Sequence, residues 1–162
     1  MIFVTVGSQL GFDRMTAAVA QWARARGRTD LFFQTGATAA DLRGFASEPL
    51  LGAAEIARLY DEADLVVAHA GTGSIIECML RGKPIIVLPR SAALHETRND
   101  HQFATARRFA ERAGVHVAWS EAELAPLLDR AVDPRGGITG GAGIGPYADE
   151  RLLAALRAFV AE

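Results

Sequence analysis

The chain has 162 residues, of which 50% are hydrophobic, and a formal net charge of −2 at pH 7. This length predicts one domain with a substantial core, and this charge argues against nucleic acid as a partner. The single cysteine, Cys78, excludes an internal disulfide and a cysteine-based zinc site. The sequence contains neither a basic leader with an apolar core nor an apolar run of membrane-spanning length. We therefore expect a single cytosolic domain over residues 1–162.

In the first third of the chain, apolar runs predict strands and helical spacing of apolar residues predicts helices. A strand is expected over residues 2–6, followed by a turn at Gly7-Ser8 and by a helix over residues 13–26 that Asp13 caps. The next apolar run predicts a strand over residues 31–35. Residues 37–51 should form a short helix and a short strand. Four apolar residues of this stretch should contact the core: Leu42, Phe45, Leu50 and Leu51.

The rest of the chain continues the same alternation. Helices are expected over residues 53–63, 102–113 and 121–131, and a further helix should start at about residues 72–74. Strands are expected over residues 64–68, 84–88 and 115–118. Residues 134–146 contain six glycines and predict a flexible surface loop. An amphipathic helix over residues 149–161 could pack on its own domain or on a partner. The pattern predicts an α/β fold with one Rossmann-like, doubly wound and mostly parallel sheet.

The segment from His69 to Glu77 joins a buried strand to the following helix through Gly71 and Gly73. A strand, a glycine turn and a helix N-terminus bring free backbone N–H groups and the positive end of the helix dipole to one point. Such a point binds anions, and the glycines would let a phosphate approach the backbone. Glu77 lies one helical turn further, where a carboxylate can reach a sugar hydroxyl. The alternative is a plain structural turn.

A second polar cluster, residues 95–102, follows the next predicted strand and opens the next helix. Because the ends of parallel strands point the same way, this cluster and the glycine turn should flank one crevice, where open α/β sheets bind ligands. Gly7 and Ser8 end the first strand at the mouth of the same crevice. They could donate hydrogen bonds to a phosphate or form a structural turn.

Several other chemistries fit the sequence poorly. Gly71-Thr72-Gly73 begins a dinucleotide-binding pattern, but Ile76 stands where its third glycine belongs. The four histidines lack the spacing of a helical zinc site, and no nucleophile-elbow serine or acidic metal clamp in a suitable loop is found. His69 could brace the glycine turn or take part in catalysis, and His95 is the second candidate for a catalytic base.

These motifs in combination resemble the C-terminal, donor-binding domain of family 28 glycosyltransferases. The similarity extends over most of the chain. It is strongest to the short, stand-alone members, which include the catalytic subunit of the two-subunit enzyme that makes chitobiosyl-dolichol and bacterial exopolysaccharide subunits. The matching elements are His-Ala-Gly-Thr-Gly-Ser over residues 69–74, Glu77, Gly82-Lys83-Pro84, Pro89, residues 95–102, Val6-Gly7-Ser8 and Phe12-Asp13-Arg14.

The resemblance implies half of a GT-B fold that binds a UDP-sugar without a metal or other cofactor. Glu77 would hold the ribose, the glycine turn would meet the diphosphate, and His101 and Gln102 would hold the sugar. Many larger relatives have glutamine where this chain has His101, so the identity of the sugar stays open. The full set expected at the donor site is Gly7, Ser8, His69, Gly71, Thr72, Gly73, Ser74, Glu77, His95, Asn99, Asp100, His101 and Gln102.

The function that follows is that of a donor-binding catalytic subunit. It would move a sugar from a UDP-sugar to a lipid-linked saccharide acceptor in exopolysaccharide or glycan biosynthesis. A membrane-anchored, acceptor-binding subunit would supply the general base and hold the chain at the inner face of the membrane. Two alternatives remain, namely a non-catalytic UDP-sugar-binding regulatory module and a GT-B-like sugar epimerase or hydrolase.

Overall fold

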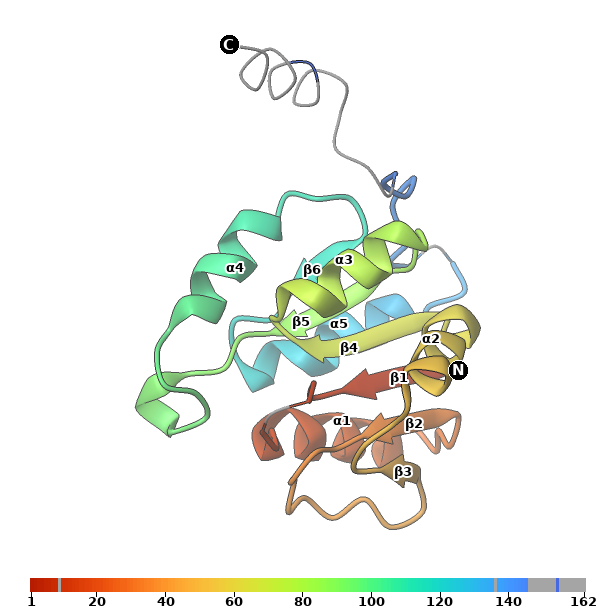
Figure 1. The fold of residues 1–162 in the computed structure, drawn as a ribbon. Coiled ribbons are helices and arrows are strands. Elements are labelled where there is room, and N and C mark those ends of the chain that lie inside the picture. The colour runs from red at the N-terminus through yellow and green to blue at the C-terminus, as the bar shows by residue number, and fades with distance from the viewer. Residues whose placement is uncertain (9, 136, 146–153, 155–162) are drawn as a thin grey trace.

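A computed structural model describes residues 1–145, except residues 9 and 136, together with Ala154 (Figure 1). In this part of the chain, six strands form one sheet in the order β3-β2-β1-β4-β5-β6, with every neighbouring pair parallel. The strand order reverses between β1 and β4, which is the topological switch point of a doubly wound sheet. The strands are β1 (Ile2–Thr5), β2 (Leu31–Gln34), β3 (Ala46–Glu48), β4 (Leu65–His69), β5 (Ile85–Leu88) and β6 (Val115–Val117).

Helices cover both faces of the sheet, as the alternating pattern predicts (Figure 1). One face packs on α1 (Asp13–Ala25) and α5 (Leu124–Ala131), and the other on α2 (Ala53–Glu62), α3 (Thr72–Leu80) and α4 (His101–Phe109). Successive residues of β1 show the division, because Ile2 and Val4 belong to the first core and Phe3 to the second. Both faces of the central strands are therefore buried, which explains their uninterrupted apolar runs.

Two details near the N-terminal half differ from the prediction. Asp13 is the first residue of α1 and makes no cap; its carboxylate instead accepts hydrogen bonds from the Thr38 hydroxyl and, at 2.7 Å, from the Ala39 N–H. Residues 37–51 contain β3 but no helix. Leu50 is 68% exposed, whereas the other three apolar residues named for this stretch pack on the core. A short apolar segment can thus contact the core from an irregular loop, without a helix to present it.

The prediction of a flexible surface loop over residues 134–146 is wrong for the described part of this segment, which packs closely on the domain. Ile138 is 9% exposed and belongs to the core. A Cβ added at Gly140 would lie 1.7 Å from the Gly82 carbonyl oxygen, and one at Gly141 would lie 2.6 Å from the Ala113 carbonyl oxygen. These glycines therefore allow backbone to pack on backbone, which a flexible surface loop would not require. The helix predicted over residues 149–161 lies outside the described residues.

The remaining boundaries follow the predictions closely, with α4 beginning one residue early and ending at Phe109 rather than Ala113. A 3₁₀ turn over residues 121–123 precedes α5. Within the described residues, none of the helices combines the length and the apolar character needed to cross a bilayer.

Candidate functional site

A cavity of about 370 Å³ lies at the carboxyl ends of β1, β4 and β5, beside the switch point of the sheet. Its volume is in the usual range for small-molecule sites. Three loops that the sequence places far apart meet there, as the crevice prediction requires. The lining residues are Val6, Gly7, Ser8 and Leu10 after β1, His69, Gly71, Gly73 and Ser74 from the end of β4 into α3, and Arg90, Thr97, His101 and Gln102 from the loop after β5 into α4.

The N-terminus of α3 opens into this cavity. Gly71 occupies the cap position in extended conformation, and no side chain among the described residues caps the helix there. The first N–H groups of α3 therefore have no side-chain cap, so that they and the helix dipole can act on an anion. A Cβ added at Gly73 would meet nothing within 4 Å, so this glycine leaves open space in the cavity wall. Thr72, the first residue of α3, is exposed and does not line the cavity.

Gly71 has a different role from Gly73. A Cβ at Gly71 would lie 2.2 Å from Nε2 of His69, and one at Gly7 would lie 2.6 Å from Cε1 of the same ring. Gly7 also has a left-handed φ of +79°, which favours glycine. The imidazole of His69 is thus packed between two glycines of different loops. The contact with His69 alone requires a glycine at position 71. The presence of Gly71 therefore does not depend on the predicted approach of a phosphate.

This packing determines the chemistry of His69. Its Nδ1 is buried and has no hydrogen-bond partner among the described residues. Burial, aided by the positive charge of Arg90, lowers the pKa of His69 to about 4. The imidazole is therefore neutral at pH 7 and a weak base, and its position suits a brace between two turns.

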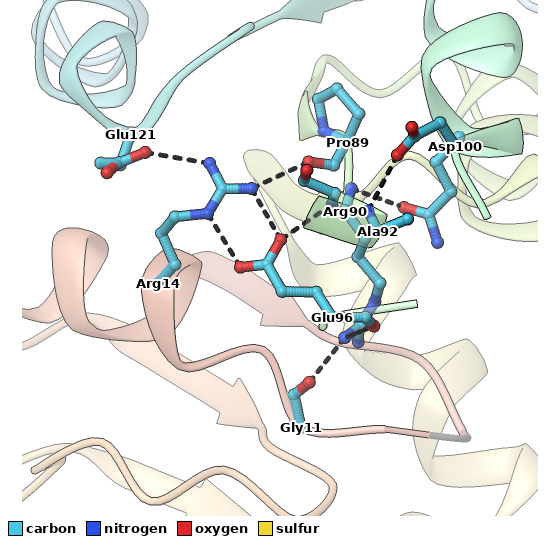
Figure 2. A network of polar contacts seen from close by, with 10 residues as sticks. Gly11, Arg14, Pro89, Arg90, Ala92, Glu96, Asp100 and Glu121 are labelled. Carbon is cyan, nitrogen blue, oxygen red and sulfur yellow. Dashed lines mark hydrogen bonds and ion pairs between the residues drawn. The ribbon is translucent and has the colours of Figure 1, made fainter. Parts of the chain in front are cut away.

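The loop after β5 is fixed to α1 by an ion pair between Arg14 and Glu96 (Figure 2). Arg14 donates from Nε and a terminal nitrogen to the two carboxylate oxygens of Glu96, and both hydrogen bonds are 2.8 Å long. The side chains are only 16% and 13% exposed. Arg14 also bonds Glu121 and the Pro89 carbonyl, and Glu96 accepts from the Ser91 N–H at 2.9 Å. Such a bidentate, largely buried pair holds the loop in one place.

Three predicted site residues shape this loop and do not line the cavity. Asp100 accepts a hydrogen bond from the Ala92 N–H at 2.8 Å (Figure 2), and Asn99 accepts one from the His101 N–H at 3.2 Å. His95 adopts a left-handed φ of 56° and lines a neighbouring hollow instead. The side chains of Asp100 and Asn99 thus satisfy the backbone of a turn, which is a common use of Asn and Asp.

The two residues predicted to read the sugar do line the cavity. Gln102 is only 6% exposed, and its side-chain oxygen accepts a hydrogen bond from the Arg90 N–H at 3.1 Å. His101, the first residue of α4, is exposed at the cavity edge. These positions follow from the start of α4, which presents its first turn to the site.

Glu77 lies in α3 one turn beyond the cavity lining. Its carboxylate is ion-paired with Arg81, which also bonds Asp61 at 2.7 Å and stacks over Tyr60 with 5.6 Å to the ring centroid. The predicted ribose ligand is thus turned toward α2, away from the glycine turn. Glu77, like Thr72, His95, Asn99 and Asp100, does not line the cavity.

Arg90 is the main cavity residue that sequence reasoning missed. It is 3% exposed and follows β5 two residues after its last apolar position. The available signal was an arginine two residues after an apolar strand, at the edge where the other site loops begin. Thr97 and Leu10 were also missed as lining residues. Among the described residues, no group of three or more His, Cys, Asp and Glu side chains is placed to hold a metal ion.

Comparison with known proteins agrees with the resemblance seen in the sequence. The mouse UDP-N-acetylglucosamine transferase subunit ALG13 is 31% identical over 118 residues, which are 65% of this chain and 10% of that protein. The UDP-N-acetylglucosamine--N-acetylmuramyl-(pentapeptide) pyrophosphoryl-undecaprenol N-acetylglucosamine transferase of Gloeobacter violaceus is 37% identical over 79 residues, 48% of this chain and 21% of that enzyme. This chain thus spans a quarter or less of either relative.

The fold is shared with solved glycosyltransferase structures. The solution structure of ALG13 superposes with a TM-score of 0.59 at 20% identity, covering 96% of this chain and 93% of that one. Residues 1–133 match the Glycosyltransferase family 28 C-terminal domain. This match includes all three loops that form the cavity. The chain therefore belongs to the glycosyltransferase family 28 C-terminal domain family, and its sheet is one half of a GT-B architecture.

Proposed function

We propose that this chain is the donor-binding catalytic subunit of a UDP-sugar-dependent glycosyltransferase. The observation that carries the proposal is the cavity over the uncapped N-terminus of α3, where Gly73 leaves space beside the backbone. Such a concentration of N–H donors can bind the diphosphate of a nucleoside diphosphate. The names of the mouse and Gloeobacter relatives, both transferases of N-acetylglucosamine, support a UDP-sugar as the ligand.

In the proposed reaction, an acceptor hydroxyl oxygen attacks the anomeric carbon of the donor sugar. The bond from that carbon to the diphosphate oxygen breaks, and UDP leaves with the electron pair. The N-terminus of α3 stabilises the negative charge that builds on the diphosphate. The hydroxyl proton passes to a general base. His69, whose pKa is about 4, is poorly suited to that role, so we assign the base to a partner.

We assign the donor groups to the loops as follows. The diphosphate lies at Gly73 and Ser74, near the Gly7-Ser8 turn, and the sugar contacts His101 and Gln102, which line the cavity after β5. Glu77 binds the ribose after its carboxylate leaves the ion pair with Arg81. The donor we favour is UDP-N-acetylglucosamine, because it is named for both relatives.

The acceptor we propose is a lipid-linked saccharide, presented by a membrane-anchored subunit in exopolysaccharide or glycan biosynthesis. Two printed names support this: ALG13 is called a subunit, and the Gloeobacter enzyme acts on a pyrophosphoryl-undecaprenol acceptor. The chain would then work at the inner face of the membrane through its partner.

The test is to assay the purified chain with UDP-N-acetylglucosamine and a polyprenyl-diphosphate saccharide, alone and with a candidate partner. Transfer should require the partner and should persist in EDTA, because helix N–H groups replace a metal clamp. Robust transfer by the chain alone would refute the two-subunit proposal. UDP binding without transfer with any partner would indicate a regulatory module, and turnover of the donor alone would indicate an epimerase or hydrolase.

A further inference from the structure

We propose that Arg90 is the positioning residue of the donor site: it holds the turn after β1 in place and gives the cavity its positive charge. This inference rests on the proposed function, because it assumes that the ligand is an anion such as a nucleoside diphosphate. Arg90 lines the same cavity as the residues that we assign to the diphosphate and the sugar.

The first part of the argument is the set of hydrogen bonds from the guanidinium. One terminal nitrogen donates to the carbonyls of Val6 and Leu10, at 2.9 and 2.7 Å. The other donates to the Gly11 carbonyl at 2.5 Å (Figure 2) and to the Glu96 carbonyl at 3.3 Å. One buried side chain thus ties the turn after β1 to the loop after β5. Both loops line the cavity, so their spacing depends on Arg90.

The second part of the argument is that the charge of Arg90 has no carboxylate partner among the described residues. All four hydrogen bonds go to neutral carbonyls, and the guanidinium lies over the Phe12 ring at 4.5 Å from the centroid. The charge of Glu96 acts on Arg90, but its carboxylate is hydrogen-bonded to Arg14 and the Ser91 N–H. Arg14, by contrast, is paired with two carboxylates.

An arginine that is 3% exposed and bonded only to neutral groups leaves a positive charge in a region of low dielectric. Burial lowers the pKa of Arg90, yet arginine stays protonated in proteins. The same charge helps to keep His69 neutral. A bound anion would supply the missing negative charge, so Arg90 should favour a diphosphate over a neutral ligand of similar shape.

The test compares the affinities of UDP and uridine, which differ in charge and share the nucleoside. Arg90→Met should weaken UDP binding about tenfold, the effect of a unit charge across partly buried protein, and change uridine binding less than about twofold. Arg90→Lys keeps the charge and should keep the ratio of the two affinities within about threefold of the parent. Affinities can be measured by NMR titration, with thermal melting as the check on folding.

The matched control is Arg24→Met. Arg24 also donates to two carbonyls, of Asp41 and Arg43, and stacks over an aromatic ring, Phe45 at 5.2 Å, but it lies outside the cavity. Arg24→Met should leave the affinities of UDP and uridine unchanged, although it removes the same net charge as Arg90→Met.

Equal weakening of UDP and uridine by Arg90→Met would show that Arg90 only holds the turn after β1, and it would overturn the proposed electrostatic role. Unchanged UDP affinity in a folded variant would do the same. If Arg90→Met does not fold, the lysine variant decides by itself, because loss of the UDP-to-uridine ratio in it would refute the claim. If the parent does not bind UDP, the proposed function fails. Inorganic pyrophosphate then replaces UDP: weaker binding in Arg90→Met upholds the role of Arg90, and no binding to the parent overturns it.

Discussion

Gly73 offers a substitution that separates stability from donor binding. An added Cβ at this position meets nothing within 4 Å, and Gly73 lies in the first turn of α3. Gly73→Ala should therefore raise the free energy of unfolding, by up to about 1 kcal/mol, because alanine is the better helix former. The same methyl group occupies the space in which we place the diphosphate. UDP affinity should fall by about 2 kcal/mol, roughly thirtyfold, the cost of losing a hydrogen bond to a charged group.

The assay combines urea unfolding with calorimetric titration of UDP. Gly52→Ala is the matched control, because Gly52 is the N-cap of α2, has a φ of −69° and also leaves open space around an added Cβ. It should cost a few tenths of a kcal/mol in stability and leave UDP affinity unchanged. If Gly73→Ala is as stable as expected and binds UDP as tightly as the parent, the diphosphate does not lie at this turn.

Four further predictions follow from the same geometry. Glu96→Gln should lower the free energy of unfolding by about 2 kcal/mol in urea titrations, whereas Glu62→Gln in an exposed pair should change it by less than about 0.5 kcal/mol; equal effects would show that the loop is not held by its ion pair. The pKa of His69 is about 4 in the folded chain and 6.5 when unfolded, so the unfolded state takes up the proton first. Unfolding free energy should therefore fall, by up to about 3 kcal/mol, as the pH drops from about 6.5 to about 4, and His69→Gln should flatten this curve; an unchanged slope in that variant would contradict the assignment. Glu77→Ala should weaken UDP binding by about 1–3 kcal/mol in calorimetry, and unchanged affinity in a folded variant would remove Glu77 from the site. Gln102→Ala should impair transfer while leaving UDP affinity nearly unchanged, and equal losses for UDP and UDP-sugar would refute its sugar-reading role.

The sequence predicted the sheet well because its strands are buried on both faces. Residues 2–6, 64–68 and 84–88 are mostly apolar, and β1, β4 and β5 lie within one residue of them at each end. Local pattern was sufficient here, since a parallel sheet covered by helices leaves few other arrangements. The crevice followed from the same reasoning, because the strand ends of a parallel sheet share one edge.

Long-range contacts account for what could not be predicted. The tight fit of Gly7 depends on the His69 ring and that of Gly140 on the Gly82 backbone, and both neighbours lie far away in the sequence. The hydrogen bonds of Arg90 join loops about eighty residues apart in sequence, with separations of 79, 80 and 84 residues. Glu77 shows the converse, because its i+4 ion pair with Arg81 turns the carboxylate away from the site that its motif predicts.

The most direct test of the proposed donor site is a titration of UDP into the isotopically labelled chain, followed by backbone amide NMR. Our proposal predicts saturable shifts concentrated at the residues that line the cavity over the N-terminus of α3. These are Gly71, Gly73 and Ser74, the Gly7-Ser8 turn, and Thr97, His101 and Gln102. Uridine should shift the same region with lower affinity. Saturable shifts on another surface, or no shift at millimolar UDP in a folded sample, would contradict the assignment of this cavity as the donor site.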